Sequence, residues 1–252
     1  MLTLYGLHVS PYTERARWAL DHHDIEYAYR EHVPLLGELT LRRKVRGTGR
    51  TTATVPVLDA DGTVVPDSIE IARYADGIGK GAHLFPKEHD DAVREWCDVA
   101  NRMMDVGRAW VLQNLADSRE AQKEALPPFV PAFAKPVLAP MSRRVALFLA
   151  KKHLSPTDIE ARVEDTVRPL LLRVRTQKGD KPYLLETFTF ADVVICATLA
   201  AVRPRASARL GPATRRVWSH EALERDFGDL LEWRDAVYAE HRPNHRPRTP
   251  ER

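Results

Sequence analysis

The sequence predicts an α/β domain followed by an all-helical domain. Two observations predict this: residues 1–80 alternate between strand-like and helix-like patterns, and after about residue 88 every periodic segment is helical. Residues 77–90 contain three glycines and a proline and are typical of a linker. We therefore expect a first domain over 1–80, a helical domain over 88–241 and a disordered tail over 242–252.

The first domain is expected to have the order β-α-β, a loop, and then β-β-α. Strand patterns cover 2–4 and 26–29, with a helix pattern over 13–21 between them. Residues 55–58 and 63–65 are strand-like and are joined by DADG, a polar turn that ends in glycine and indicates a hairpin. Asp67-Ser68 then offers an N-cap for a helix that ends near Asp76. The long basic loop over 33–54 has room for a short helix.

The second domain is expected to contain one long helix over 90–117 and further helices after it. Five prolines within 126–140 argue against a continuous helix there. Ser155 to Asp158 is a helix start, and Pro169 should kink or divide the helix that follows. A nearly all-apolar helix over 193–202 should form the buried centre of this domain, and 219–241 should again be helical.

The composition is that of an ordinary globular chain. Apolar residues make up 44% and charged residues 29%, and 38 basic residues stand against 35 acidic ones, a balance that gives no sign of nucleic-acid or membrane binding. No apolar run reaches the roughly 18 residues of a membrane span, and the first residues lack the pattern of a signal peptide. Cys97 and Cys196 indicate two buried thiols rather than a disulfide or metal site. We expect a cytoplasmic protein without a metal.

Four short motifs occur in a fixed order. They are SPYTERAR at 10–17, TVPVL at 54–58, Asp67-Ser68, and TFAD at 189–192. In this order they resemble the glutathione transferase family: the active-site turn of its serine and cysteine classes, its cis-proline segment, its acidic-Ser pair and the capping box of its helical domain. The resemblance spans roughly 1–110 and 180–240. It implies a thioredoxin-like N-terminal domain, glutathione as co-substrate, and a homodimer.

Ser10 is the candidate catalytic residue. A free thiol has a pKa of about 8.5, and both a hydroxyl donor and the positive end of a helix favour the thiolate. Lowering the thiol pKa by about two units needs roughly 2.7 kcal/mol, and one charge-assisted hydrogen bond contributes about 1.5–3 kcal/mol. The alternative is that Ser10 only caps the helix. Tyr5, Tyr12 and Thr13 are rival hydroxyls.

Ser10 stands where the thiol-transferring members of the family carry cysteine. A serine cannot form a mixed disulfide, so a glutaredoxin-like reductase is disfavoured. The resemblance therefore implies either glutathione conjugation or peroxide reduction by bound glutathione.

The resemblance also implies how the tripeptide would be held. A cis bond before Pro56 would turn the backbone N–H and C=O of Val55 towards the cysteinyl unit of glutathione. Ser68 would bind the γ-glutamyl carboxylate at a helix N-terminus, and Asp67 would meet the γ-glutamyl ammonium. The alternatives are an ordinary proline at a strand start and a simple N-cap.

The glycyl carboxylate of glutathione needs a cation. We favour Arg50, with Lys44 and Arg46 in the same loop; the alternative is a solvated basic loop.

Apolar walls for the second substrate are expected near Tyr12 and along the long helix. The helix residues are Met103, Met104, Gly107 and Trp110, with Phe129 and Phe133 in the proline-rich segment. Apolar stripes at this spacing are equally typical of a helix core. Asp192, at the third position after Thr189, should accept the backbone N–H of Thr189 and serve structure rather than catalysis.

Two functions remain open at this point. The first is an enzyme that activates glutathione for attack on a small hydrophobic electrophile or a peroxide, as in detoxification. The second is a non-catalytic binding or interaction module with the same fold, because fold alone does not fix function. Under either function the expected partners are glutathione and a second copy of the chain, with no nucleic acid and no membrane.

Overall fold

The computed structural model describes residues 1–33, 37–46, 48, 53–126, 130–153 and 159–242, and only the backbone of 148–153. It divides into two compact units. Unit 1 comprises Met1–Val93, Thr187–Ala197 and Val237–Arg252, and unit 2 comprises Arg94–Glu186 and Thr198–Ala236. Unit 1 therefore combines segments from the beginning and the end of the chain. The boundaries at 80 and 88 stay a prediction.

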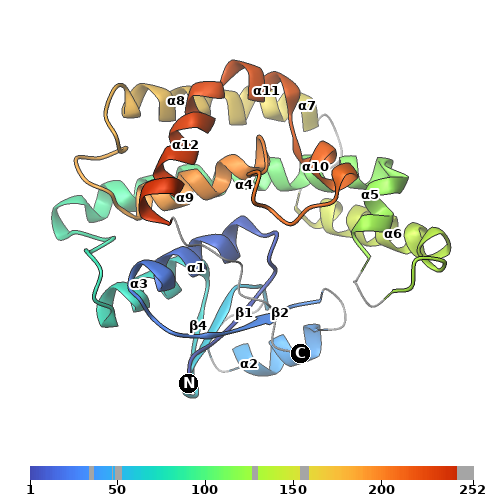
Figure 1. Cartoon of the computed structure of the whole chain (residues 1–252), viewed down its shortest axis with the longest axis horizontal. Helices are drawn as coiled ribbons and strands as arrows, with labels where there is room; N and C mark the ends of the chain where they lie inside the picture. The colour runs from blue at the N-terminus through green and yellow to red at the C-terminus, as the bar shows by residue number, and fades with distance from the viewer. Residues whose placement is uncertain (34–36, 47, 49–52, 127–129, 154–158, 243–252) are drawn as a thin grey trace. The chain divides into compact units, whose positions relative to one another are not determined.

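Unit 1 is built on a four-stranded sheet of order β2-β1-β3-β4 (Figure 1). The central strand β1 (Thr3–Gly6) pairs in parallel with β2 (Ala28–Glu31) and antiparallel with β3 (Val57–Ala60). Strand β3 forms the predicted hairpin with β4 (Thr63–Pro66). In its turn, the N–H of Gly62 donates to Oδ1 of Asp59 at 3.0 Å. This sheet with its helices is the thioredoxin-like domain that the sequence predicts.

Helices cover both faces of the sheet. Figure 1 shows α1 (Pro11–His22) and α3 (Ser68–Ile78) on one face and α2 (Glu38–Val45) on the other. The buried Val57 packs against Leu41 and Val45 of α2. Because side chains alternate along a strand, the fully buried pair Leu4 and Leu58 faces the α1 and α3 side. The short helix for which the basic loop had room is α2.

The last described residue returns to α1. Arg242 is 6% exposed and forms ion pairs with Glu14 and Asp21. The hydroxyl of Tyr238 also donates to Glu14 at 3.2 Å, and its ring centroid lies 4.1 Å from that of Trp18. Since Glu14 and Asp21 are two turns apart on α1, this contact fixes most of the length of the helix. The rest of the predicted tail, 243–252, lies outside the described residues.

The segment after α3 is tied to α1 through a buried histidine. Nδ1 of His23 accepts the N–H of Gly81 at 3.2 Å, and Nε2 lies 3.1 Å from Oδ1 of Asp76. The same carboxylate oxygen accepts the N–H of Leu84 at 2.5 Å. Burial, reinforced by the neighbouring His22, lowers the pKa of His23 below its ordinary value, and Asp76 opposes this shift only in part. The neutral imidazole of His23 is therefore the form that fits these contacts, in which Nδ1 accepts a hydrogen bond.

The predicted capping box is confirmed at the start of α9 (Phe190–Thr198). Oδ2 of Asp192 accepts the backbone N–H of Thr189 at 2.9 Å, and Oγ1 of Thr189 accepts the N–H of Ala191 at 3.3 Å. Thr189 and Asp192 are both fully buried. Asp192 therefore has the structural role expected from its position.

The remaining elements are all helical, as predicted. The long helix α4 (Asp90–Asp117) has the expected bounds. The others are the 3₁₀ helix η1 (Lys87–His89), α5 (Arg119–Glu124), α6 (Lys135–His153), α7 (Ile159–Arg162), the π-helical η2 (Val163–Val167), α8 (Arg168–Lys178), the 3₁₀ helix η3 (Leu199–Ala201), α10 (Pro212–Trp218), α11 (Glu221–Asp226) and α12 (Gly228–His241). Within the described residues, no helix combines the length and the apolar character that crossing a membrane requires.

Two effects of proline agree with expectation. In the described part of 126–140, residues 130–134 are not helical, so no continuous helix runs through this segment, and α6 begins only at Lys135 and then contains Pro140. Pro136 occupies the first turn, where no backbone N–H is needed, so only Pro140 removes a helical hydrogen bond. Pro169 does divide a helix: it lies in the first turn of α8, directly after the π-helical η2. The helix start predicted at 155–158 lies outside the described residues.

Asp192→Ala should lower the free energy of unfolding by about 2–3 kcal/mol, because the buried N–H of Thr189 loses a charged acceptor. Chemical denaturation measures this. Asp192→Asn, which keeps an acceptor oxygen, should lose less. Asp105→Ala, at an exposed position of α4, is the control and should stay within about 0.5 kcal/mol of wild type. Equal losses for Asp192→Ala and Asp105→Ala would contradict the capping role.

The buried His23 should make stability depend on pH. Its pKa is lower when folded than when unfolded, so the unfolded chain binds more protons below about pH 6.5 and stability falls there. The contribution of one such group cannot exceed about 1.4 kcal/mol per pH unit. Burial also lowers the pKa of His32 and His241, which add to the slope. Denaturant titrations between pH ~7.5 and ~5.5, about one pH unit either side of the unfolded value, should show a smaller slope for His23→Asn than for His89→Asn. Equal slopes would refute this assignment.

Candidate functional site

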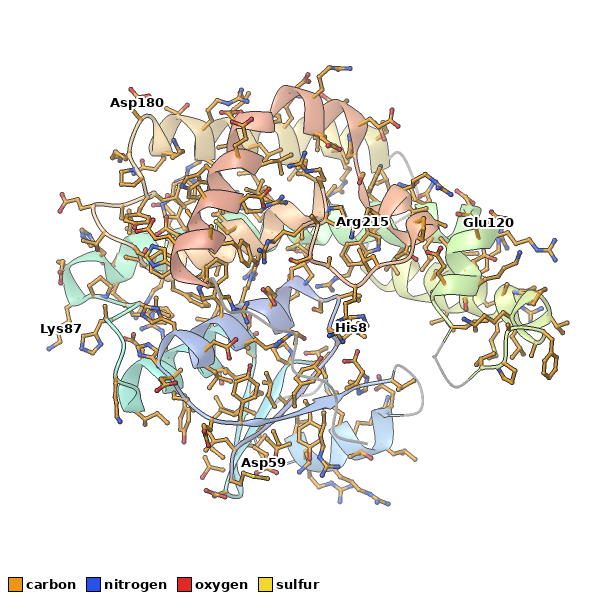
Figure 2. All side chains as sticks on the ribbon, viewed as in Figure 1. His8, Asp59, Lys87, Glu120, Asp180 and Arg215 are labelled. Carbon is orange, nitrogen blue, oxygen red and sulfur yellow. The ribbon has the colours of Figure 1, made fainter. Side chains whose placement is uncertain are left out.

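A row of residues paired across three strands of the sheet brings the three motifs of unit 1 together. Tyr5 of β1 is paired with Val57 of β3, which is paired in turn with Pro66 of β4. The turn after β1, the residues before β3 and the residues after β4 therefore meet at one end of the sheet. The N–H of Asp67 donates to the carbonyl of Pro56 at 3.3 Å and joins two of them directly. Figure 2 shows His8 at this end and Asp59 at the opposite end.

The turn that carries Ser10 is held by backbone and side-chain bonds at Leu7. The N–H of Leu7 donates to Oγ1 of Thr13 at 3.1 Å, and its carbonyl accepts the N–H of Ser10 at 2.8 Å. Ser10 has the extended backbone of an N-cap (φ −79°, ψ 125°), and its carbonyl accepts the N–H of Glu14 at 3.0 Å. Its hydroxyl makes no capping bond to α1. The helix therefore uses the backbone of Ser10 and leaves the hydroxyl to other partners.

The rival hydroxyls have other surroundings. Thr13 is fully buried, and its oxygen accepts the N–H of Leu7. Tyr5 packs beside the α2 cluster, with Nζ of Lys44 lying 4.8 Å from the ring centroid. The ring of Tyr12 is half-buried, with the guanidinium of Arg15 4.7 Å from its centroid. These contacts favour Ser10 as the hydroxyl that faces a ligand.

The charges on α1 suit an anion at its N-terminus. Glu14 lies in the first turn and by itself would oppose a second negative charge there. Arg242 pairs with it and offsets that charge. Burial would lower the pKa of Arg242, but Glu14 and Asp21 outweigh it and raise the pKa above its ordinary value. The positive end of the helix dipole is thus not cancelled by the neighbouring acid.

The second motif has the backbone that the resemblance implies. The peptide bond between Val55 and Pro56 is cis. Pro56 is buried and Val55 is half-buried. Both therefore stand directly before β3, at the same end of the sheet as Ser10.

The third motif combines a cap with an unsatisfied hydroxyl. Oδ1 of Asp67 accepts the N–H of Ile69 at 2.8 Å, so Asp67 is the N-cap of α3. Its φ of 78° and ψ of 143° form a conformation that costs a non-glycine residue about 1–3 kcal/mol and often marks a functional site. Ser68 is 1% exposed, and its Oγ has no hydrogen-bond partner within the described part of the chain. Such a hydroxyl at a helix N-terminus can donate a hydrogen bond to an acceptor atom of a ligand.

Of the three basic residues considered for the glycyl carboxylate, the structure describes Lys44 and Arg46. Arg50, the predicted residue, lies outside the described residues. Lys44 pairs with Asp59 at 2.6 Å, and this hydrogen bond holds the pKa of Asp59 below its ordinary value. Arg46 is exposed and lines, with Lys44, a polar groove of about 450 Å³ whose other walls include Pro66 and Glu70.

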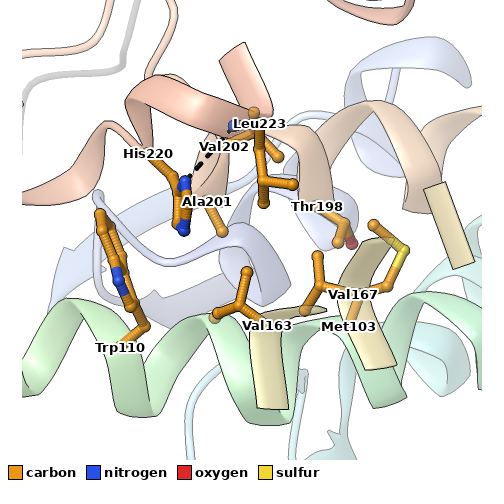
Figure 3. Close-up of a pocket in the computed structure, with 10 residues that line it drawn as sticks. Met103, Trp110, Val163, Val167, Thr198, Ala201, Val202, His220 and Leu223 are labelled. Carbon is orange, nitrogen blue, oxygen red and sulfur yellow. Dashed lines mark hydrogen bonds between the residues drawn. The ribbon is translucent and has the colours of Figure 1, made fainter. Parts of the chain in front are cut away.

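The residues predicted for the second substrate belong to different units. Tyr12 lies in unit 1, whereas Met103, Gly107 and Trp110 lie in unit 2. Those three line a small pocket of about 20 Å³ (Figure 3), which has room for about one water molecule. A Cβ added at Gly107 would lie 3.1 Å from that of Ala201, so Gly107 permits close helix packing. Within unit 2 these residues pack the core; their role as substrate walls stays a prediction.

The other three residues predicted for the second-substrate walls have separate outcomes. Met104 is buried, and Phe133 is 85% exposed. Phe129 lies outside the described residues.

Sequence reasoning missed a cluster that supports the Ser10 turn. The backbone N–H of His8 donates to Oε1 of Glu31 at 3.1 Å, and its Nδ1 lies 2.8 Å from the same oxygen. The hydroxyl of Tyr29 donates to Oε2 of Glu31 at 2.9 Å. Burial alone would raise the pKa of Glu31, but the bonds from His8 outweigh it and hold the pKa below its ordinary value. No local pattern links residues that meet only through the pairing of β1 with β2.

Thr13→Val should weaken glutathione binding because the N–H of Leu7 would lose its acceptor and the Ser10 turn would loosen. An unsatisfied buried donor costs about 1–3 kcal/mol, so stability should fall by that amount. Calorimetric titration with glutathione and chemical denaturation measure the two effects. Thr13→Ser, which keeps the hydroxyl, is the control. Wild-type affinity in Thr13→Val would show that this bond does not position the turn.

Comparison with known proteins agrees with this geometry. Residues 4–82 match the family model for the glutathione S-transferase N-terminal domain. A search of curated proteins gave no match. The fold is similar to that of a glutathione S-transferase of Ceriporiopsis subvermispora in complex with glutathione, with 15% identity, a TM-score of 0.61, and 98% of this chain and 99% of that chain covered.

Two further structures share the fold. One is a glutathione S-transferase from Methylobacillus flagellatus with glutathione bound, with 17% identity, a TM-score of 0.58, and 94% and 95% of the two chains covered. The other is the beta-etherase LigF from Sphingobium sp. strain SYK-6, with 17% identity, a TM-score of 0.60, and 98% and 96% covered. Residues 4–82 thus match the N-terminal domain of glutathione S-transferases, and the whole chain has the fold of the glutathione S-transferase structures.

Proposed function

We propose that this protein is a glutathione transferase in which Ser10 stabilises the glutathione thiolate for attack on a small hydrophobic electrophile or a peroxide. The observation that carries the proposal is the Ser10 hydroxyl: it stands at the N-terminus of α1, yet the helix does not use it. A hydroxyl donor and the helix dipole can therefore act together on one sulfur atom.

The other two motifs would hold the tripeptide. The backbone of Val55 would pair with the cysteinyl unit, since Val55 stands beside the Ser10 turn at the same sheet end. The Oγ of Ser68, without a partner among the described residues, would donate to the γ-glutamyl carboxylate. The carboxylate of Asp67 would meet the γ-glutamyl ammonium. Arg50 or Arg46 would face the glycyl carboxylate, because Lys44 already pairs with Asp59.

The chemistry needs no general base in this scheme. The thiol loses its proton to solvent because the bound thiolate is favoured by the hydroxyl and by the helix end. The sulfur lone pair then forms a bond to the electrophilic carbon, and the leaving group departs with the bonding electrons. Ser10 keeps its proton throughout and only donates a hydrogen bond. Its contribution is electrostatic and depends on a position fixed in advance.

A binding module with little turnover is the second candidate. The observation that favours a binding module is that one carboxylate oxygen of Asp67 already accepts a hydrogen bond as the cap of α3. Retention on immobilised glutathione, followed by a conjugation assay with an aryl halide, distinguishes the two. Retention with turnover supports the enzyme, and retention without turnover supports the module. No retention would overturn both.

Homodimer formation and a cytoplasmic location complete the proposal. The homodimer rests on the family resemblance and the cytoplasmic location on the composition of the sequence; light scattering and cell fractionation test them.

Ser10→Ala should raise the pKa of bound glutathione and reduce turnover by about 10- to 1000-fold, the scale of one preorganised donor. Thiolate absorbance of the complex, followed across pH, measures the first effect, and the conjugation assay measures the second. Ser118→Ala is the matched control, because Ser118 caps α5 through its own hydroxyl. An unchanged thiolate titration in Ser10→Ala would exclude the proposed role.

A further inference from the structure

The start of α6 and the turn before it carry exposed apolar side chains. Phe133 and Val137 are 85% and 78% exposed, and Met141 is 54% exposed. Pro136 and Pro140, between them, are also exposed. The four residues from Pro136 to Met141 lie in α6 at the three- and four-residue spacing that places side chains on one helix face, and Phe133 lies in the turn directly before the helix. We call these five residues the α6 stripe.

The opposite face of the same helix is packed. Ala139 and Ala146 are 0% and 2% exposed. Nε of Arg143 donates to the carbonyl of Ala116 at 3.2 Å, which ties α6 to the end of α4 within unit 2. The helix is therefore anchored by one side, and the stripe on the other side is not part of the core of its unit.

All charged residues in the segment that carries the stripe are basic. No acidic residue occurs between Glu124 and Asp158, whereas this segment contains Lys135, Arg143 and Arg144, followed by Lys151 and Lys152. Arg144 is exposed, lies one turn beyond the stripe, and has no hydrogen bond or ion pair among the residues that the structure describes. An apolar face on a segment whose only charged residues are basic is the pattern of a helix that lies in a membrane interface.

We propose that the α6 stripe docks onto a membrane surface that contains anionic phospholipids. The apolar side chains would enter the boundary between headgroups and acyl chains, and the basic residues would meet lipid phosphates and carboxylates. The helix would lie on the surface and not cross it, because its other face is packed against the protein. The sequence-based expectation of no membrane partner rested on net charge, which does not register a local acid-free segment.

A second copy of the chain is the less favoured occupant. A stable protein interface buries about 800 Å² on each partner, from about 20–30 residues, and the stripe offers only five. A symmetric contact through the stripe would also bring the basic residues of two copies together without an acidic partner from this segment. Charge complementarity thus favours an anionic lipid surface.

The test is co-sedimentation of the full chain with vesicles. We expect binding to vesicles of phosphatidylcholine mixed with phosphatidylserine, little binding to pure phosphatidylcholine, and weaker binding as salt is added. Val137→Asp should reduce the partition coefficient by about tenfold or more, since an apolar contact is replaced by a charge. Arg144→Glu should reduce it by about twenty-five-fold, the effect of losing two unit charges near an anionic surface.

Leu172→Asp is the matched control, because Leu172 is another exposed apolar residue of unit 2, on α8. Its binding should equal that of wild type. The proposal is overturned if wild type does not bind anionic vesicles, or if all three variants bind equally well. It is also overturned if light scattering shows that Val137→Asp splits a dimer while vesicles bind neither form. If Val137→Asp does not fold by circular dichroism, the exposed Arg144→Glu decides alone.

Discussion

The pairing of Tyr5 with Val57 and of Val57 with Pro66 is the constraint on which the candidate site depends. Each of the three motifs is short and common by itself. The sheet brings the motifs together, because its register places the end of β1, the start of β3 and the end of β4 at one end of the sheet. A slip of one residue would turn every side chain of a strand to the other face and would move the motifs apart. The hairpin turn and the packing of α2 against β3 hold that register.

A second layer of contacts sets the electrostatics at this end of the sheet. Leu7 fixes the Ser10 turn through Thr13, and Glu31 holds His8 from the neighbouring strand. Arg242 returns from the end of the chain to offset the charge of Glu14 near the helix N-terminus. The chemistry proposed for Ser10 thus depends on residues that hold the turn and the charges around it. This chemistry needs a small local electrostatic field at the sulfur atom rather than several catalytic groups.

Sequence reasoning succeeded where the signal is local. The capping box at Thr189 and the hairpin turn are encoded by adjacent residues, and the long helix α4 has the predicted bounds. It failed where contacts are distant, since Arg242 and Glu14 are 228 positions apart. Pro140 nevertheless lies inside α6, because a proline near a helix start removes only one hydrogen bond and packing of the helix can offset that loss. The burial of Ser68 without a partner could not be inferred from composition or periodicity.

The most direct test of the central claim is a crystal structure of the wild-type protein grown with glutathione. The account predicts the sulfur atom within about 3.5 Å of the Ser10 Oγ, where a hydroxyl can donate to a thiolate, with the γ-glutamyl carboxylate against Ser68. A tripeptide whose sulfur lies beyond reach of Ser10, or a sheet edge filled by protein side chains in the presence of ligand, would contradict it.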